Sequence, residues 1–81
     1  MKWKPLDSSV FTSAAYSPSR RMLYLRFTSG EIYQYFDVPV EEYRAFLVAD
    51  SHGRYFSSHI RDKYRCERLA KLKVMTKRAQ N

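Results

Sequence analysis

Two alternating segments joined at a single glycine constrain the fold of this chain more than any other feature of its sequence. Apolar residues alternate with others over residues 22–27, which is the period-2 pattern of a half-buried strand. After Gly30, a second segment places Tyr33 and Tyr35 two residues apart. Because successive strand side chains point to opposite faces, both tyrosines leave the same face. The pattern therefore predicts an antiparallel hairpin.

The length of the connecting loop decides which face the two tyrosines occupy. A three-residue loop with Gly30 in the left-handed conformation places Tyr33 opposite Leu25. Tyr35 then lies opposite Leu23, and all four side chains are in the core. A two-residue loop shifts the register by one residue and moves both tyrosines to the other face, as a stacking platform. We favour the three-residue loop, because the sequence has neither Asn-Gly nor Asp-Gly at the turn.

The remaining segments predict a third strand and two helices. Residues 9–16 contain aromatic and β-branched residues and end at a turn-forming Ser-Pro-Ser cluster, which is typical of a strand. Pro39 suits the first turn of a helix that we expect to end at about residue 49. Ser51 can cap a second helix that runs to about Tyr64. We therefore expect an α+β domain of three antiparallel strands (β-β-β) followed by two short helices.

Charge and length divide the 81 residues into three parts. We expect an N-terminal arm over residues 1–6, one small domain over residues 7–64 and a basic tail over residues 65–81. The tail holds six of the fifteen Lys and Arg residues but only one of the eight acidic residues. Its apolar residues recur at helical spacing, which predicts a third, basic helix. A clustered basic segment attracts polyanions such as nucleic acid, and also acidic protein surfaces.

Several classes of protein are disfavoured by what the sequence lacks. The single Cys66 cannot form an internal disulfide, and no apolar run approaches the roughly 20 residues that cross a bilayer, so we expect a cytoplasmic protein and no membrane partner. His52, His59 and Cys66 are too few for a metal site. The adjacent Asp50-Ser51-His52 does not suit a catalytic triad, and no glycine-rich phosphate loop is present. We expect no enzyme activity, no metal and no cofactor.

Ordered motifs recur along most of the chain, from Asp7 to Tyr64. They are Ser8-Ser9, Ala15-Tyr16, Leu23-x-Leu25-x-Phe27, Ser29-Gly30, Tyr33-x-Tyr35, Val38-Pro39, Tyr43, residues 49–56, Ile60-Arg61 and Tyr64. In this order they resemble the KTSC domain family. That family is named for its occurrence at the C-terminus of some lysyl-tRNA synthetases, and it includes small stand-alone bacterial and phage proteins with a central Tyr-x-Tyr signature. The chain departs from the usual family pattern at Ala15, where glycine is usual, and at Ser57, where asparagine is common.

The resemblance implies a fold and suggests RNA binding, because of the synthetase context. It implies structural roles for Gly30, Tyr33, Tyr35, Pro39, Gly53, Phe56 and Ile60. The basic tail lies outside the resembling region.

The combined features favour a module that binds RNA or single-stranded nucleic acid. Basic side chains beside aromatic rings contact phosphates and stack on unpaired bases. The alternative is a protein-interaction module whose basic amphipathic tail binds an acidic partner. The same residues are also compatible with ordinary solvated charges beside core aromatics. The candidate nucleic-acid-binding residues are Tyr24 and Arg26 on the sheet face opposite the two tyrosines, and Arg54, His59, Arg61, Lys63, Arg65, Arg68 and Lys71 in the second helix and the tail.

Overall fold

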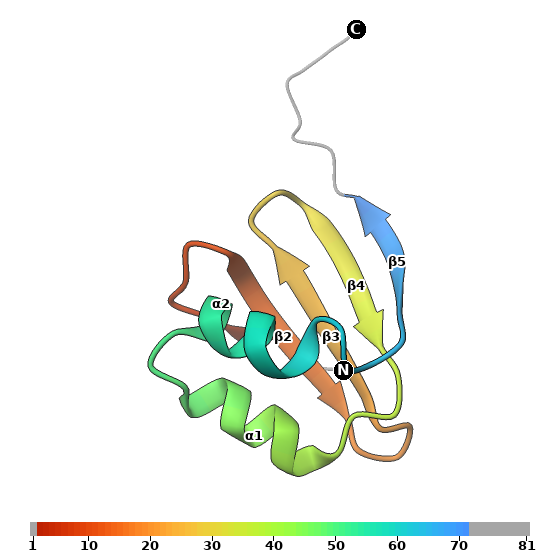
Figure 1. The fold of residues 1–81 in the computed structure, drawn as a ribbon. Helices are drawn as coiled ribbons and strands as arrows, with labels where there is room; N and C mark the ends of the chain where they lie inside the picture. The colour runs from red at the N-terminus through yellow and green to blue at the C-terminus, as the bar shows by residue number, and fades with distance from the viewer. Residues whose placement is uncertain (1, 72–81) are drawn as a thin grey trace, which may run out of the picture.

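Five antiparallel strands form one sheet, and two helical segments lie across one of its faces (Figure 1). The computed structural model describes residues 2–71. The strands lie in the sheet in chain order: β1 (Lys4–Pro5), β2 (Phe11–Ser17), β3 (Met22–Phe27), β4 (Glu31–Tyr35) and β5 (Cys66–Lys71). Between β4 and β5 the chain forms α1 (Val40–Val48) and then α2 (His52–Tyr55), which continues into the π-helical turn η1 (Phe56–Ile60).

The α+β class, the antiparallel sheet and the two helices are confirmed, but the predicted count of three strands is wrong, and one strand follows the helices. The expected N-terminal arm contributes β1, and the start of the expected tail forms β5. The prediction of a tail helix is therefore wrong for Cys66–Lys71, and the remainder of that prediction, over residues 72–81, lies outside the described residues. β5 pairs with the edge of β4 that does not face β3. If Cys66–Lys71 formed a helix, the backbone groups along that edge would have no strand partner.

The register between β3 and β4 confirms the three-residue loop. Leu25 lies opposite Tyr33, and Leu23 lies opposite Tyr35, as that loop requires. Gly30 has a φ of 99°, a conformation that glycine adopts without steric cost. Tyr35 is only 4% exposed. The two tyrosines therefore face the helices, and Tyr35 is a core residue.

The helical layer follows the predicted starting points but ends earlier. α1 begins directly after Pro39, and the Ser51 hydroxyl accepts a hydrogen bond from the Arg54 N–H at 3.2 Å, which caps α2. The second helix was predicted to reach about Tyr64, but it ends with η1 at Ile60. In this wider turn, the Arg61 N–H donates a hydrogen bond to the Phe56 carbonyl, five positions back, at 2.9 Å. Turns of this kind often occur at functional sites.

Aromatic rings fill the space between the sheet and the helices. Phe11 on β2 meets Phe46 on α1 edge to face at 5.5 Å and Phe56 on η1 at 5.3 Å. Tyr16 stacks on Tyr43 with the ring centroids 4.9 Å apart, which joins the end of β2 to α1. Because each ring buries a large apolar area, a domain of this size reaches a stable core with few residues.

Three of the residues with implied structural roles meet clear packing demands in the structure. Phe56 and Ile60 are buried beneath the helical layer, with Ile60 fully inaccessible. A Cβ atom on Gly53 would lie 3.1 Å from a methyl group of Val10. That separation is tighter than ordinary van der Waals contact, so a glycine lets α2 approach the start of β2 closely.

Candidate nucleic-acid interface

The sheet face turned away from the helices, here called the outer face, carries a second and smaller group of packed rings. Ala15, Met22 and Tyr24 are buried there, and Trp3 and Phe36 pack against them. Both α1 and α2 lie on the opposite side of the sheet (Figure 1). The outer face is thus covered by side chains alone among residues 2–71, and its two largest covering rings remain partly exposed.

At one end of the outer face, a guanidinium group lies over an indole ring. The Arg26 Cζ atom is 4.6 Å from the centroid of Trp3, and Trp3 meets Tyr24 edge to face at 6.5 Å. The Nε atom of Arg26 is buried and has no hydrogen-bond partner within the described part of the chain. Cation–π attraction holds the charged plane in place without a carboxylate.

At the other end of the outer face, a second guanidinium lies over a second ring. The Arg65 Cζ atom is 4.1 Å from the centroid of Phe36. Arg26 pairs with Ile32 across the β3–β4 ladder, four residues before Phe36. At a rise of about 3.3 Å per residue, Arg26 and Phe36 are separated by roughly 13 Å along the strand direction. The outer face therefore presents two similar arginine–aromatic units, one beside β1 and β3 and the other where β4 ends and β5 begins.

Tyr24 does not offer the open ring that its sequence position suggested. Its side chain lies on the outer face, as predicted, but it is 8% exposed beneath Trp3. The exposed aromatic surface belongs to Trp3 and Phe36, which the candidate set did not contain. Phe36 shares its face with Arg26 by strand alternation, so period-2 counting could have found it. Nothing in the alternation of β3 and β4 locates Trp3, because it reaches the sheet through β1.

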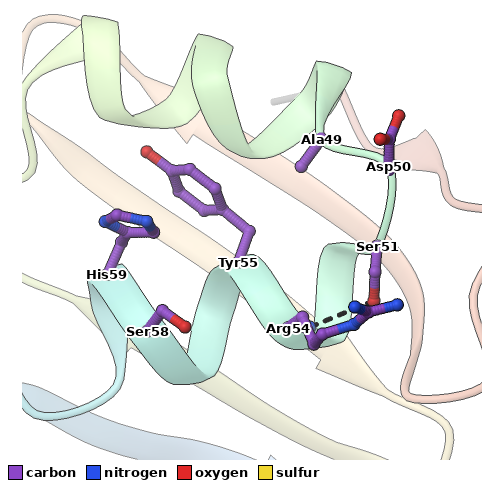
Figure 2. A pocket seen from close by; sticks show the side chains of 7 residues that line it. All are labelled: Ala49, Asp50, Ser51, Arg54, Tyr55, Ser58 and His59. Carbon is purple, nitrogen blue, oxygen red and sulfur yellow. Dashed lines mark hydrogen bonds between the residues drawn. The ribbon is translucent and has the colours of Figure 1, made fainter.

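Arg54 and His59 lie together, in a shallow pocket of about 320 Å³ between the end of α1 and the α2–η1 segment. Figure 2 shows Tyr55 in the middle of this pocket, with His59 and Ser58 on one side. The His59 imidazole stacks on the Tyr55 ring at 4.3 Å. Asp50 lines the same pocket, so its carboxylate opposes the charge of Arg54. The pocket has mixed charge and little apolar depth, which makes it a weaker polyanion site than the outer face.

Lys63 is held by a carboxylate that three side chains share. Its Nζ lies 3.2 Å from Oε1 of Glu42, the Tyr64 hydroxyl donates to the same oxygen at 2.7 Å, and the Tyr55 hydroxyl donates to Oε2. Burial acts to raise the pKa of Glu42, but these hydrogen bonds outweigh it and lower that pKa. Burial and the hydrogen bond to Glu42 raise the pKa of Tyr55 and of Tyr64 to about 12. The group joins α1 to the end of the helical layer.

Arg61 lies in a groove between the inner side of β4–β5 and η1, with a volume of about 350 Å³. Tyr33 and Tyr35 line the same groove. Arg68 on β5 pairs with Glu31 at 3.4 Å, and Glu31 also lines the groove. The backbone of Lys71 lies opposite Glu31, and its side chain is outside the described atoms.

The structure thus divides the nine predicted residues among separate surfaces. Arg26 and Arg65 share the outer face with the buried Tyr24, and Arg54 and His59 share the helical pocket. The others lie in the Glu42 cluster or near the β4–β5 groove. A single continuous interface made of all nine does not exist among the described residues, and the outer face is the surface that best combines rings with arginines.

Within residues 2–71, none of the helices has both the length and the apolar character that crossing a membrane requires. Within the same residues, no three His, Cys, Asp or Glu side chains come close enough together to hold a metal ion.

Comparison with known proteins identifies the family. The KTSC domain profile matches residues 7–64. A protein of Tsukamurella paurometabola is 36% identical over 66 residues, which cover 82% of this chain and 98% of that protein. The crystal structure of a KTSC domain protein from Yersinia pestis superposes with a TM-score of 0.83 at 35% identity, covering 85% of this chain and 97% of that one. The chain belongs to the KTSC domain family.

A lysine–tRNA ligase also contains a similar segment. The ligase of a Nostoc species is 34% identical over 64 residues, which cover 79% of this chain but only 11% of the ligase. The similarity is thus confined to a small part of that enzyme.

Proposed function

We propose that this protein is a binding module for single-stranded RNA and that the outer face is its binding surface. The observation that carries the proposal is the pair of guanidinium groups lying over partly exposed rings, Arg26 over Trp3 and Arg65 over Phe36. Each unit offers a planar surface on which a base can stack and a positive charge that a phosphate can approach.

The shape of the outer face favours unpaired bases over a duplex. Its rings are part of a broad sheet surface, whereas reading a double helix requires an element that enters a groove. Two separate stacking units on one face suit an extended strand whose bases are splayed out. The formal net charge of +7 supports binding of a polyanion at low salt.

The family relationship supports the same ligand class. The Nostoc relative that contains a similar segment is a lysine–tRNA ligase. A small domain attached to an enzyme that acts on tRNA is well placed to contact RNA, and the outer face of the present chain has the chemistry for that contact.

Arginine-to-lysine and arginine-to-alanine substitutions test the proposal by separating stacking from charge. In Arg26→Lys/Arg65→Lys the charges remain but the planar stacking groups are lost. We expect this variant to bind a fluorescent oligouridine about tenfold more weakly with an unchanged salt slope, because stacking contributes roughly 1–3 kcal/mol per base. In Arg26→Ala/Arg65→Ala the salt slope should also decrease by about 1.4, since each phosphate contact to a single strand contributes about 0.7.

Arg44→Ala is the matched control, because Arg44 is an exposed arginine on α1, on the other side of the sheet. Its affinity for oligouridine should stay within about twofold of the wild type at every salt concentration. Equal losses per removed charge in Arg44→Ala and Arg26→Ala/Arg65→Ala, with no loss in Arg26→Lys/Arg65→Lys, would show that only net charge matters and would refute the outer-face assignment. Absence of binding at low salt would refute the function itself.

A further inference from the structure

A groove on the helical side of the sheet runs between α1 and β1, the strand at the N-terminal edge. Its volume is about 370 Å³. Basic and apolar side chains line it together, and we call it the basic groove; among them are Lys2, Lys4, Tyr16, Val40, Arg44 and Leu47. Past Tyr16 and Pro18, which line both hollows, it continues into a second hollow of about 380 Å³ that reaches Arg20 in the β2–β3 turn. The two hollows therefore form one elongated surface.

The N-terminal edge of the sheet contributes side chains to two different surfaces. Lys4 lies opposite Ala14, which belongs to the core beneath the helices. Opposed side chains in a sheet share a face, and successive side chains alternate. Lys2 and Lys4 therefore point to the helical side, whereas Trp3 packs on the outer face. The basic groove and the outer face are on opposite sides of the sheet.

The cations of the basic groove carry uncompensated charge. Lys2, Lys4 and Arg44 are all exposed. Within residues 2–71 none of them pairs with a carboxylate, because the three ion pairs in that range use other cations, namely Arg21, Lys63 and Arg68.

The walls of the basic groove and of its extension toward Arg20 contain no carboxylate from the described part of the chain. By contrast, carboxylates line the three other hollows of similar size, from Asp50 in one, Glu41 and Glu42 in the next, and Glu31 and Asp62 in the last. Opposite charges across an interface speed association and exclude wrong partners. The basic groove is thus the hollow that suits an acidic ligand.

The side chains between these cations favour a peptide over a nucleic acid. Tyr16 and Tyr43 stack on each other at 4.9 Å with their planes inclined by 12°, and Tyr43 is only 8% exposed. The Tyr16 hydroxyl also donates to the Val38 carbonyl, so the pair is fixed and leaves little ring surface on which a base could stack. Val40 and Leu47 instead offer partly exposed aliphatic groups, which suit an apolar side chain.

We infer that the basic groove is a docking site for an acidic peptide segment of another protein. The segment lies along the groove, with carboxylates against Lys2, Lys4 and Arg44 and an apolar side chain against Val40 and Leu47. A second copy of this chain is a poor occupant, because its formal net charge of +7 opposes self-association. The inference does not depend on RNA binding, and it places protein recognition on the folded domain instead of on the basic tail.

Selection of peptides tests the groove. A display library of random linear peptides is selected on the full-length wild-type protein, with Lys4→Glu/Arg44→Glu used for counter-selection. The selected peptides should contain several acidic residues and at least one large apolar residue. In a selected peptide, replacing the carboxylates with amides, or the apolar residue with serine, should each lower the affinity at least about tenfold.

Arg54→Glu/Arg61→Glu is the matched control, because it makes the same change in net charge at exposed arginines outside the groove. The selected peptides should bind Lys4→Glu/Arg44→Glu at least about tenfold more weakly than this control, with both variants folded by circular dichroism. If charge reversal prevents folding, Arg44→Ala and Arg54→Ala replace the two variants, with an expected difference of about threefold. In NMR titrations of the wild type, the amides of Lys4, Tyr16 and Arg44 should shift most.

The peptide site and the RNA surface can be separated by opposite pairs of effects. Arg44→Ala should weaken the binding of selected peptides but leave the binding of oligouridine unchanged. Arg26→Lys/Arg65→Lys should weaken the binding of oligouridine but leave the binding of selected peptides unchanged. Loss of one function without the other therefore tells which of the two proposals fails.

Three results would overturn the inference. The first is a selection that enriches no acidic peptide. The second is an equal loss of peptide affinity in Lys4→Glu/Arg44→Glu and in its control, because only net charge would then matter. The third is displacement of the selected peptides by oligouridine together with weaker oligouridine binding in Lys4→Glu/Arg44→Glu than in the control, because the groove would then be a nucleic-acid site.

Discussion

The two faces of the sheet are both lined with aromatic residues, yet they are closed in different ways. On the inner face, α1 and the α2–η1 segment bring Phe46, Phe56 and Ile60 onto the rings of the sheet, and Phe11 is completely buried. On the outer face, the covering rings among residues 2–71 are Trp3 and Phe36, and an arginine lies over each. The inner-face packing stabilises the fold, whereas the outer face leaves planar, charged groups accessible to a ligand.

This difference separates folding from binding in a very small domain. Inner-face substitutions should mainly lower the free energy of unfolding, and outer-face substitutions should mainly lower the affinity for RNA. The following substitutions compare the two faces.

Phe11→Ala tests the inner face at its most buried ring. We expect the free energy of unfolding to fall by about 3–5 kcal/mol, which is the usual cost of removing a large buried side chain. Chemical denaturation followed by circular dichroism measures the change. A loss below about 1 kcal/mol would mean that the inner face is not the main core.

Glu42→Gln tests the contact between α1 and the end of the helical layer. Loss of the charge weakens the hydrogen bonds from Tyr55, Tyr64 and Lys63, and we expect a cost of about 2 kcal/mol at neutral pH. The pKa of Glu42 is lower in the folded chain. The charge of Glu42 therefore stabilises the fold fully above the unfolded pKa of about 4.3, and this stabilisation is lost as the pH falls through the folded pKa.

The denaturation curves of wild type and Glu42→Gln should therefore converge at acidic pH. A constant difference between them down to low pH would show that the Glu42 charge does not carry the interaction.

Trp3→Ala tests the cover of the outer face. We expect a cost of about 1–2 kcal/mol, since the indole is only partly buried and its loss also removes the stacking partner of Arg26. The fold should persist, with a circular dichroism spectrum in the far ultraviolet like that of the wild type. A cost as large as that of Phe11→Ala would remove the distinction between the two faces.

Val48→Ser gives the baseline for both faces. Val48 is 81% exposed near the end of α1, so the free energy of unfolding should change by less than about 0.5 kcal/mol. Thermal unfolding monitored by calorimetry checks this, and a larger loss would indicate that α1 makes contacts beyond those described.

Local pattern determined what could be predicted from the sequence. The β3–β4 register followed from the alternation of side chains and from the single glycine in the loop, which together leave few alternatives. β5 could not be predicted in the same way, because its short stretch mixes charged and apolar residues and suits a helix equally well. Residues 66–71 form a strand because the free edge of β4 offers them backbone hydrogen-bond partners. That edge exists only in the assembled sheet, so it leaves no signal in the local sequence.

The candidate site shows the same limit. Arg26 and Arg65 were identified by their charge, but they are about forty residues apart in the chain, and only the pairing of β4 with both β3 and β5 brings them to one face. Trp3 falls within the predicted arm, because two residues of strand, Lys4–Pro5, are too short to leave a pattern.

Trp3 is the single tryptophan of the chain, so its fluorescence reports on the outer face directly. Titration of the full-length protein with oligouridine at low salt should quench that fluorescence, with the same midpoint as the anisotropy of labelled oligouridine. The quenching should be weak in Arg26→Lys/Arg65→Lys and unchanged in Arg44→Ala. Binding detected by anisotropy with no change in the Trp3 emission would place the RNA elsewhere and contradict the assignment of the outer face as the binding surface.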